Sequence, residues 1–281
     1  MRRTIPALVL LVMLAPSAFA RKILAPLGIA QQLVQSDAVV VGKVTSIEKE
    51  LVEVKSRPEA TETTAYTVAI VKVETVIHGV KNATHVKVGF ILRAVPQDEE
   101  LRFEDDGRRN LNLDEKGEYL LFLRKHPSAG FYTFDYSTPP QPLPAEAAVA
   151  EAKLAAAAIA DPMKALRAEK AQERAFAAMV LLIHYRQPAQ RGATDSVAIG
   201  AEENAAILNA ISEGDWTVAI TGYTTLSSAY QYLGLSATDG WQHPIAKPGE
   251  NHHLVMQKAF QDWLAGPGAK FRYQRSVAKK N

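Results

Sequence analysis

The chain has 281 residues, of which 47% are hydrophobic and 22% are charged, as in an ordinary globular protein with a substantial core. The formal charge of +2 equals the contribution of Arg2 and Arg3, and the remaining 30 basic and 30 acidic side chains balance, so no global field favours nucleic acid or an anionic membrane. The absence of cysteine excludes disulfides, thiolate nucleophiles, cysteine-type zinc sites and iron–sulfur clusters.

Residues 1–20 have the layout of a secretory signal peptide. Arg2 and Arg3 give a positive start, residues 5–14 are a short apolar run, and residues 18–20 (Ala-Phe-Ala) match the small-x-small cleavage pattern. The apolar run is too short to span a bilayer, which needs roughly 20 residues. We therefore expect an exported protein, periplasmic or secreted, that starts near Arg21 and has no transmembrane segment after cleavage.

Residues 21–136 predict a β domain. After a short helical turn at 29–34, residues 36–50 form a β-branched run of the kind that suits a buried sheet. Gly42 within this run predicts a bulge or a bend. In the second strand, one side is expected to carry Val71, Val73, Thr75 and Ile77.

Five strands are predicted in all, and together they indicate a small barrel or sandwich. Residues 51–64 are expected to form a loop or a frayed hairpin tip, and residues 93–116 a long charged excursion. The predicted strands cover residues 36–50, 66–78, 84–92, 117–124 and 130–136.

The composition changes at residues 137–144, where four prolines predict a stiff linker. Residues 145–281 predict an α-helical domain with a basic C-terminal tail. Asp161 and Pro162 are typical of a helix start, as N-cap and first position, and Gly234 is typical of a helix end. The first predicted helix begins at Ala145. The other four cover residues 161–186, 201–212, 224–233 and 252–264.

The first strand, the segment VKVETVIHG (71–79) and the segment GEYLLFL (117–123) occur in an order that resembles the netrin-like or tissue-inhibitor-of-metalloprotease-like OB barrel of secreted proteins. The resemblance covers residues 34–136 and implies a fold only. That family acts through disulfides and an N-terminal cysteine, which this chain lacks, so no inhibitory residue is carried over. The stretches AAMVLLIHYR, AEENAAILNAI and LGLSATDGW resemble uncharacterised secreted bacterial proteins, a resemblance that supplies no activity.

The predicted fold class is therefore α+β with two domains, an N-terminal antiparallel OB-like β-barrel followed by an α-helical domain. Among candidate metal ligands, the histidines cluster only at His243, His252 and His253. Adjacent helical residues point about 100° apart, and no HExxH pattern is present, so exposed imidazoles at a helix start are favoured over a metal site. His184, beside Leu182 and Ile183, is interpreted as a boundary histidine rather than a base.

The acidic stretch Asp98–Asp106 is a second candidate for metal binding. Asn110, Asn112 and Asp114 further on have the alternate spacing of a calcium loop, but Glu115 and Leu121 occupy the positions that require Gly and Glu. A solvated charged loop is favoured, and Leu113 is expected at an exposed strand or loop edge.

No motif for catalysis or phosphate binding is found, since GxSxG, the P-loop pattern and GxGxxG are all absent. We accordingly assign no catalytic, cofactor-binding or metal residue. The basic and aromatic stretch at residues 270–280 could stack on single-stranded nucleic acid, but the balanced charge favours a final strand or a docked tail with Phe271 and Tyr273 inward. Trp241 is either an exposed recognition residue or a buried residue that fills the core of the helices, and burial is favoured.

These observations favour an exported, non-enzymatic binding or protein-interaction protein, with an unknown protein or envelope partner and no nucleic acid. Two alternatives stay open. One is an exported hydrolase with a dispersed site at the domain interface near residues 239–253, which would need a histidine and a carboxylate within hydrogen-bond reach in a cleft. The other is a structural envelope component.

Overall fold

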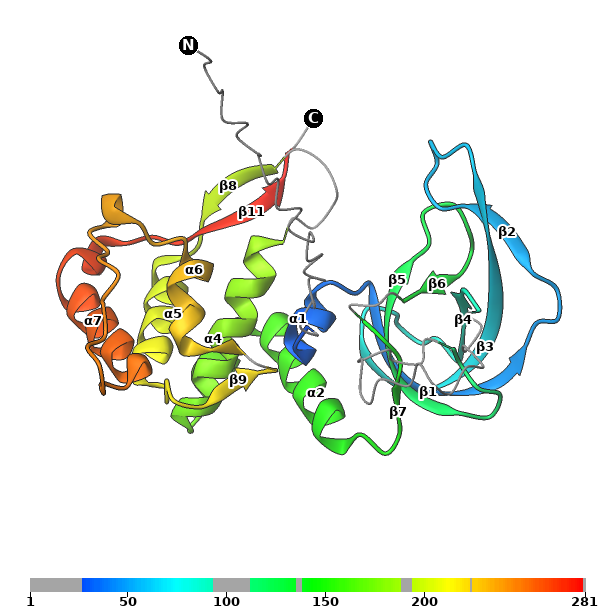
Figure 1. Ribbon diagram of the computed structural model, residues 1–281, viewed down its shortest axis with the longest axis horizontal. Coiled ribbons are helices and arrows are strands. Elements are labelled where there is room, and N and C mark those ends of the chain that lie inside the picture. Colours follow the sequence, from blue (N-terminus) through cyan, green and yellow to red (C-terminus); the bar gives the residue numbers. More distant parts are fainter. Residues whose placement is uncertain (1–26, 93–111, 135–137, 188–193, 223, 280–281) are drawn as a thin grey trace, which may run out of the picture.

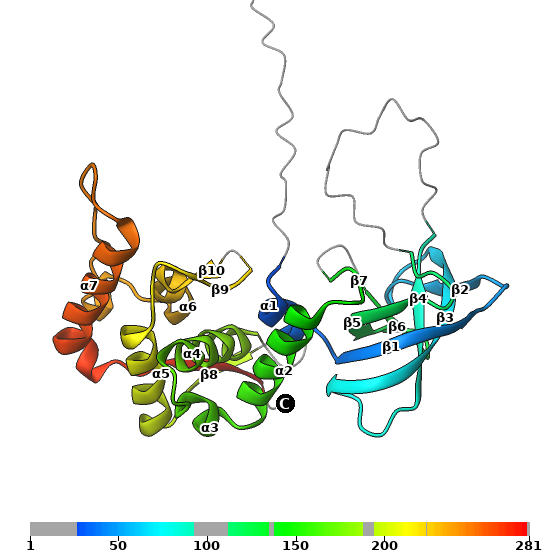
Figure 2. The ribbon, with the colours of Figure 1, turned by 90° about the horizontal axis from the view of Figure 1, so that it is seen from below.

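The computed structural model describes residues 27–92, 112–134, 138–187, 194–222 and 224–279. The fold is mixed α+β, with a seven-stranded sheet at one end and a group of helices at the other. Two helices, α1 (Ile29–Val34) and α2 (Glu146–Ala160), lie between these parts in both views (Figure 1, Figure 2). The predicted signal peptide and the acidic stretch at 98–106 lie outside the described residues.

The sheet pairings run β1–β3–β4–β6–β5, and β5 pairs again with β1. All are antiparallel except the parallel pair β4–β6, while β2 pairs with β3 and β7 with β5. The strands are β1 (Ala38–Ile47), β2 (Val52–Lys55), β3 (Thr63–His78), β4 (His85–Phe90), β5 (Glu118–Lys125), β6 (Tyr132–Thr133) and β7 (Gln141–Pro142).

The four longest strands confirm the predictions from the sequence, and two other segments differ. At 51–64, predicted as a loop or a frayed hairpin tip, the hairpin alternative holds, but with a strand the prediction lacked: β2, whose exposure alternates, pairs with the start of the long β3. Of the strand predicted at 130–136, only Tyr132–Thr133 forms a strand within the described residues. The bulge at Gly42 is confirmed, because the β1–β3 register shifts there and a Cβ would lie 2.6 Å from the Lys72 carbonyl oxygen.

Strands β1 and β5 are buried on both faces, which explains their unbroken apolar sequences. Side chains on one face pack against side chains of the other strands, and side chains on the opposite face belong to the core that the helices form. Because side chains alternate along a strand, neighbouring residues enter different cores. The face toward the helices carries Val39, Val41, Leu120 and Phe122, and the face within the sheet carries Ala38, Val40, Leu121 and Leu123.

The helices after α2 are α3 (Pro162–Leu166), α4 (Ala171–Arg186), α5 (Ala201–Glu213), α6 (Ala229–Leu233) and α7 (His252–Ala265). The helices predicted at 201–212 and 252–264 are confirmed. The prediction of one helix over 161–186 was wrong, because the chain leaves the helix after Leu166. Arg174 stabilises this break by donating to the carbonyls of Ala168 and Glu169, at 3.0 and 2.8 Å.

Two predicted helix signals hold locally. Asp161 caps α3 by accepting a hydrogen bond from the Lys164 amide, at 3.1 Å. Gly234 ends α6 in the left-handed region, with φ of +72°. The helix predicted over 224–233 was too long, because Thr224–Thr225 form strand β10 and Leu226–Ser228 form the 3-10 turn η2 before α6 begins.

The described part of the proline-rich segment, residues 138–144, is packed against the sheet. Thr138 is fully buried, and β7 pairs with β5, with the Leu143 amide donating to the Glu118 carbonyl at 2.9 Å. The C-terminal stretch forms strand β11 (Gln274–Ala278), as favoured from the sequence, and pairs with β8 (Thr194–Ala198). Strand β8, and the pairing of β9 (Ala219–Thr221) with β10, were not predicted. Within the described residues, no helix combines the length and the apolar character needed to cross a bilayer.

Candidate functional site

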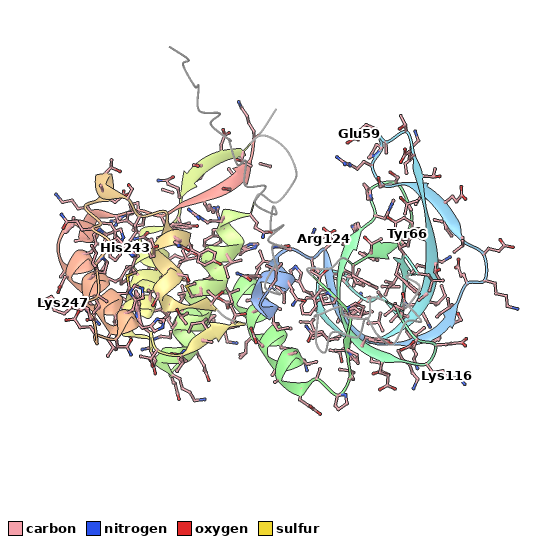
Figure 3. All side chains as sticks on the ribbon, viewed as in Figure 1. Glu59, Tyr66, Lys116, Arg124, His243 and Lys247 are labelled. Carbon is pink, nitrogen blue, oxygen red and sulfur yellow. The ribbon has the colours of Figure 1, made fainter. Side chains whose placement is uncertain are left out.

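Helix α1 connects the sheet to the helices through polar contacts at both of its ends. At its start, the Gln31 side chain accepts from the Gly28 amide at 3.1 Å and donates to the Tyr232 hydroxyl at 2.8 Å. At its end, the Arg124 guanidinium of β5 donates to the Gln35 carbonyl at 2.9 Å and to the Gln35 side chain at 2.6 Å. Figure 3 places Arg124 on the side of the sheet that faces α1. These bonds hold the helix in a fixed position between the two parts.

The start of α1 lies unusually close to the end of β9. A Cβ placed on Gly28 would lie 2.6 Å from Thr221 Oγ1 and 2.9 Å from the Thr221 carbonyl carbon. Gly222 follows with φ of +55°, and its Cβ would lie 2.9 Å from the Gly28 Cα. Both positions therefore require glycine, one for close backbone approach and one also for its conformation.

A pocket of ≈ 710 Å³ opens beside α1. Its volume lies in the range of about 300–1,000 Å³ that small-molecule sites usually have. Four parts of the chain contribute to it: the start of α1, the segment before and within β5, the proline-rich segment with the start of α2, and the end of β9. The lining residues are Leu27, Gly28, Ile29, Gln32, Asn112, Asp114, Tyr119, Pro139, Pro140, Gln141, Pro142, Ala145, Glu151 and Gly222.

Glu151 of α2 is the half-buried carboxylate of this pocket. It accepts a hydrogen bond from Thr221 Oγ1 at 2.5 Å, and that hydroxyl accepts from the Ala30 amide at 3.3 Å. Burial raises the pKa of the Glu151 carboxyl, against the hydrogen bonds from Thr221 and the Ala30 amide, which favour its charged form. The carboxylate is thus fixed in place by α1 and β9 while it remains short of full hydration.

Asp114 and Tyr119 form the opposite polar part of the lining. The Tyr119 hydroxyl donates to Asp114 Oδ2 at 3.2 Å and accepts from the Asp114 amide at 3.0 Å. Burial raises the pKa of Tyr119, of which only 5% is exposed. The hydroxyl therefore stays protonated at neutral pH and fixes the Asp114 carboxylate.

Gln32 is the third polar group, and it is 2% exposed. Its Nε2 donates to the Leu27 carbonyl at 2.8 Å, which orients the amide, while its Oε1 has no hydrogen-bond partner in the structure. A buried acceptor without a partner is costly in a folded protein. Gln32 thus supports the pocket wall, with an Oε1 that lies below the accessible surface.

The histidine cluster, which we define as His243, His252 and His253 with Ser227 and Tyr230, lies elsewhere, around the start of α7. The ring centroids of His243 and His252 are 6.4 Å apart, and the Tyr230 ring packs at a tilt against His243, with centroids 5.0 Å apart. Asn251 caps α7 by accepting from the His253 amide at 2.9 Å. Figure 3 shows His243 at the end of the molecule far from Arg124. Across the described part of the chain, no three His, Asp or Glu side chains gather so that they could hold a metal ion.

One contact in this cluster has catalytic character, since Ser227 Oγ lies 2.7 Å from His253 Nδ1. A catalytic imidazole of this kind is usually oriented by a carboxylate on its second nitrogen. Among the described residues, no carboxylate forms a hydrogen bond with His253. The histidine–carboxylate pair that the hydrolase alternative requires is therefore not found in this part of the structure.

The remaining sequence candidates are placed as follows. Trp241 is 5% exposed and packs against Tyr230, Phe260 and Trp263, so its predicted burial is confirmed. His184 is half-buried at the edge of α4, and burial, followed by the charges of His78 and Arg275, lowers its pKa. Leu113 was expected at an exposed edge, but it is 3% exposed, because it belongs to the core within the sheet.

The pocket residues were missed by motif analysis. Asn112 and Asp114 drew attention only as a failed calcium pattern, while Gln32 and Glu151 carry no sequence signal of a site. No family model matches this chain, and a comparison with curated proteins likewise finds no match.

Proposed function

We propose that this protein is a non-enzymatic binding protein and that the pocket beside α1 is its ligand site. The observation that carries the proposal is the ≈ 710 Å³ pocket, whose walls come from four separate parts of the chain. Its two carboxylates are already fixed by Thr221 and Tyr119, so little ordering would be required when a ligand binds. Apolar walls with a few fixed polar groups are the usual build of a small-molecule site.

We also propose that the sheet is a small OB-like barrel and that the helices form a second domain. The return of the pairings from β5 to β1 supports the barrel, because such a ring leaves β1 without a free edge. Export, supported by the pattern of residues 1–20, and an unknown protein or envelope partner complete the proposal. Cell fractionation of the tagged full chain would test export, and a pull-down from the envelope fraction would test the partner.

A fragment screen on the purified protein, read by ligand-observed NMR, tests the site. We expect several fragments to bind and Ala145→Trp to abolish their binding, because Ala145 lines the pocket and the indole would fill it. The matched control is Ala147→Trp, an exposed position on the same helix outside the lining, which should leave binding unchanged. Binding that survives Ala145→Trp, or a screen without hits, would contradict the proposal.

A second candidate, a hydrolase, is favoured only by the contact between Ser227 Oγ and His253 Nδ1. If Ser227 were an activated nucleophile, a fluorophosphonate probe would label the purified protein, and Ser227→Ala would remove the label. We expect no labelling, because the imidazole lacks an orienting carboxylate among the described residues. Labelling at Ser227 would replace the binding proposal with the hydrolase.

A further inference from the structure

We propose that the ligand of the pocket is an organic ammonium, a protonated amine attached to an apolar body. This inference rests on the proposed function, because it names the chemical class that the same pocket would take. Three features carry it: the charge of the lining, the kind of hydrogen-bonding groups it offers and the apolar character of its walls.

The charge of the lining is negative. Among the fourteen described residues that line it are two carboxylates, Asp114 and Glu151, and none of the fourteen is Lys, Arg or His. Each carboxylate accepts a hydrogen bond from a neutral group, the hydroxyl of Tyr119 or of Thr221, so no cation among the described lining residues offsets either charge. Glu151 is half-buried whereas Asp114 is exposed, so an opposite charge on the ligand is favoured, and a like charge disfavoured, chiefly at Glu151. Anionic ligands are therefore poor candidates.

The two carboxylates of the lining can only accept hydrogen bonds. Gln32 adds no open group, because its Nε2 is used by the Leu27 carbonyl and its Oε1 is buried below the pocket surface. An ammonium group has three donors and no acceptor, and so complements the two carboxylates. Hydrogen bonds between a charged donor and a carboxylate are also roughly twice as strong as neutral ones.

The walls favour an organic body over a bare ion. Leu27, Ile29 and three prolines contribute apolar surface, and the ring of Tyr119 adds to it. No group of three His, Asp or Glu side chains that could hold a metal ion is found in the described ranges. A metal ion would also leave most of a ≈ 710 Å³ pocket unfilled. An amine with an aromatic or aliphatic body satisfies both the polar and the apolar parts.

The test uses matched triads of probes that share a body and differ in charge. For three bodies (phenylethyl, cyclohexylethyl and hexyl), the amine, the alcohol and the carboxylate are titrated into the purified protein by calorimetry at pH 7. We expect at least one amine to bind about tenfold or more tightly than its alcohol, and its carboxylate not to bind, since a charge-assisted contact replaces a neutral one. The double variant Asp114→Asn, Glu151→Gln should remove that preference.

The matched control is Glu146→Gln, an exposed carboxylate on the same helix that does not line the pocket, and it should retain the preference for the amine. Two failures are distinguishable. If fragments bind but the amine holds no advantage, or the double variant keeps it, the ammonium inference is wrong and the site stands. If neither fragments nor triads bind, the proposed function itself is wrong.

Discussion

The pocket beside α1 and the histidine cluster at the start of α7 are opposite kinds of candidate site. The cluster gathers reactive residue types that are near one another in the sequence, yet their rings pack against each other in tilted and edge-on pairs, with centroids 5.0–6.4 Å apart, around a helix start. The pocket contains few reactive types, and Gln32, Asp114 and Glu151 lie far apart in the chain. The pocket offers fixed polar groups around an open volume, whereas the rings of the cluster lie against one another, and this difference is why we propose the pocket as the ligand site.

The largest expected effect concerns the support of the histidine cluster. Trp241→Ala removes a buried indole that packs against Tyr230, Phe260 and Trp263, and should lower the free energy of unfolding by about 3–5 kcal/mol. Urea denaturation measures this change. Under conditions where the variant is folded, probe binding at the pocket should be unchanged. A loss below about 1 kcal/mol would mean that Trp241 is not a core residue.

Trp241→Phe is the control for this result. The indole Nε1 is buried without a hydrogen-bond partner, so the phenyl ring keeps much of the packing and loses no hydrogen bond. We expect it to cost clearly less than Trp241→Ala. Equal losses in both variants would indicate that an unseen bond of the indole nitrogen supplies most of the effect.

The second effect concerns the support of the pocket. Gly28→Ala places a Cβ against the Thr221 backbone and should cost about 1–3 kcal/mol, because α1 must move away from β9. Since Gly28 and Thr221 position Glu151 and the pocket wall, fragment affinity should also fall. Denaturation and the NMR screen provide the two measurements. Gly130→Ala, where a Cβ would meet nothing within 4 Å, should change the stability by less than about 0.5 kcal/mol.

Sequence periodicity predicted most of the fold because local signals were strong there. Gly42 predicted a bulge, Asp161 a helix start and Gly234 a helix end. Each of these residues shapes the backbone only within a few positions of its own. Strand β2 and the break after Leu166 were missed for a different reason. They depend on partners elsewhere, the long β3 in one case and the Arg174 side chain in the other.

The candidate site could not be predicted in the same way. Glu151 is one carboxylate among 30 acidic residues, and only the approach of Thr221, 70 positions further on, gives it a special environment. Gln32 is ordinary in sequence and becomes notable only because its Oε1 is buried without a partner. Such a site depends on the distances between segments that are remote in the sequence, and no periodic pattern of residues in the sequence indicates these distances.

The third prediction concerns whether the contact between Ser227 and His253 only stabilises the fold. Ser227→Ala removes one half-buried hydrogen bond to His253 and should cost about 0.5–1.5 kcal/mol without changing fragment binding. His252→Ala alters an exposed side chain and should stay within about 0.5 kcal/mol. Thermal denaturation of the two variants gives the comparison. A gain in stability on removing Ser227 would instead indicate a strained, functional pair and would favour the hydrolase.

The smallest effect is the pH dependence that Glu151 confers. Burial raises the pKa of this carboxyl above its ordinary value of 4.5, so its protonated form is favoured in the folded state. It therefore contributes stability that is fully present below pH 4.5 and is lost as the pH rises through the higher folded pKa. Glu151→Gln cannot titrate, so as the pH rises above 4.5 the variant should gain stability relative to the parent protein. Denaturation at several pH values measures the difference.

Glu146→Gln tests whether this gain belongs to the pocket, because Glu146 is exposed on the same helix and its removal should leave the pH profile unchanged. The result bears directly on the ligand. A carboxylate that is costly to ionise in the empty protein is one whose charge an ammonium would stabilise on binding, so affinity for the amine probes should rise over the same pH range. If the profiles of Glu151→Gln and the parent protein are parallel, Glu151 is fully hydrated, and the electrostatic difference between the pocket and the exposed histidine cluster disappears.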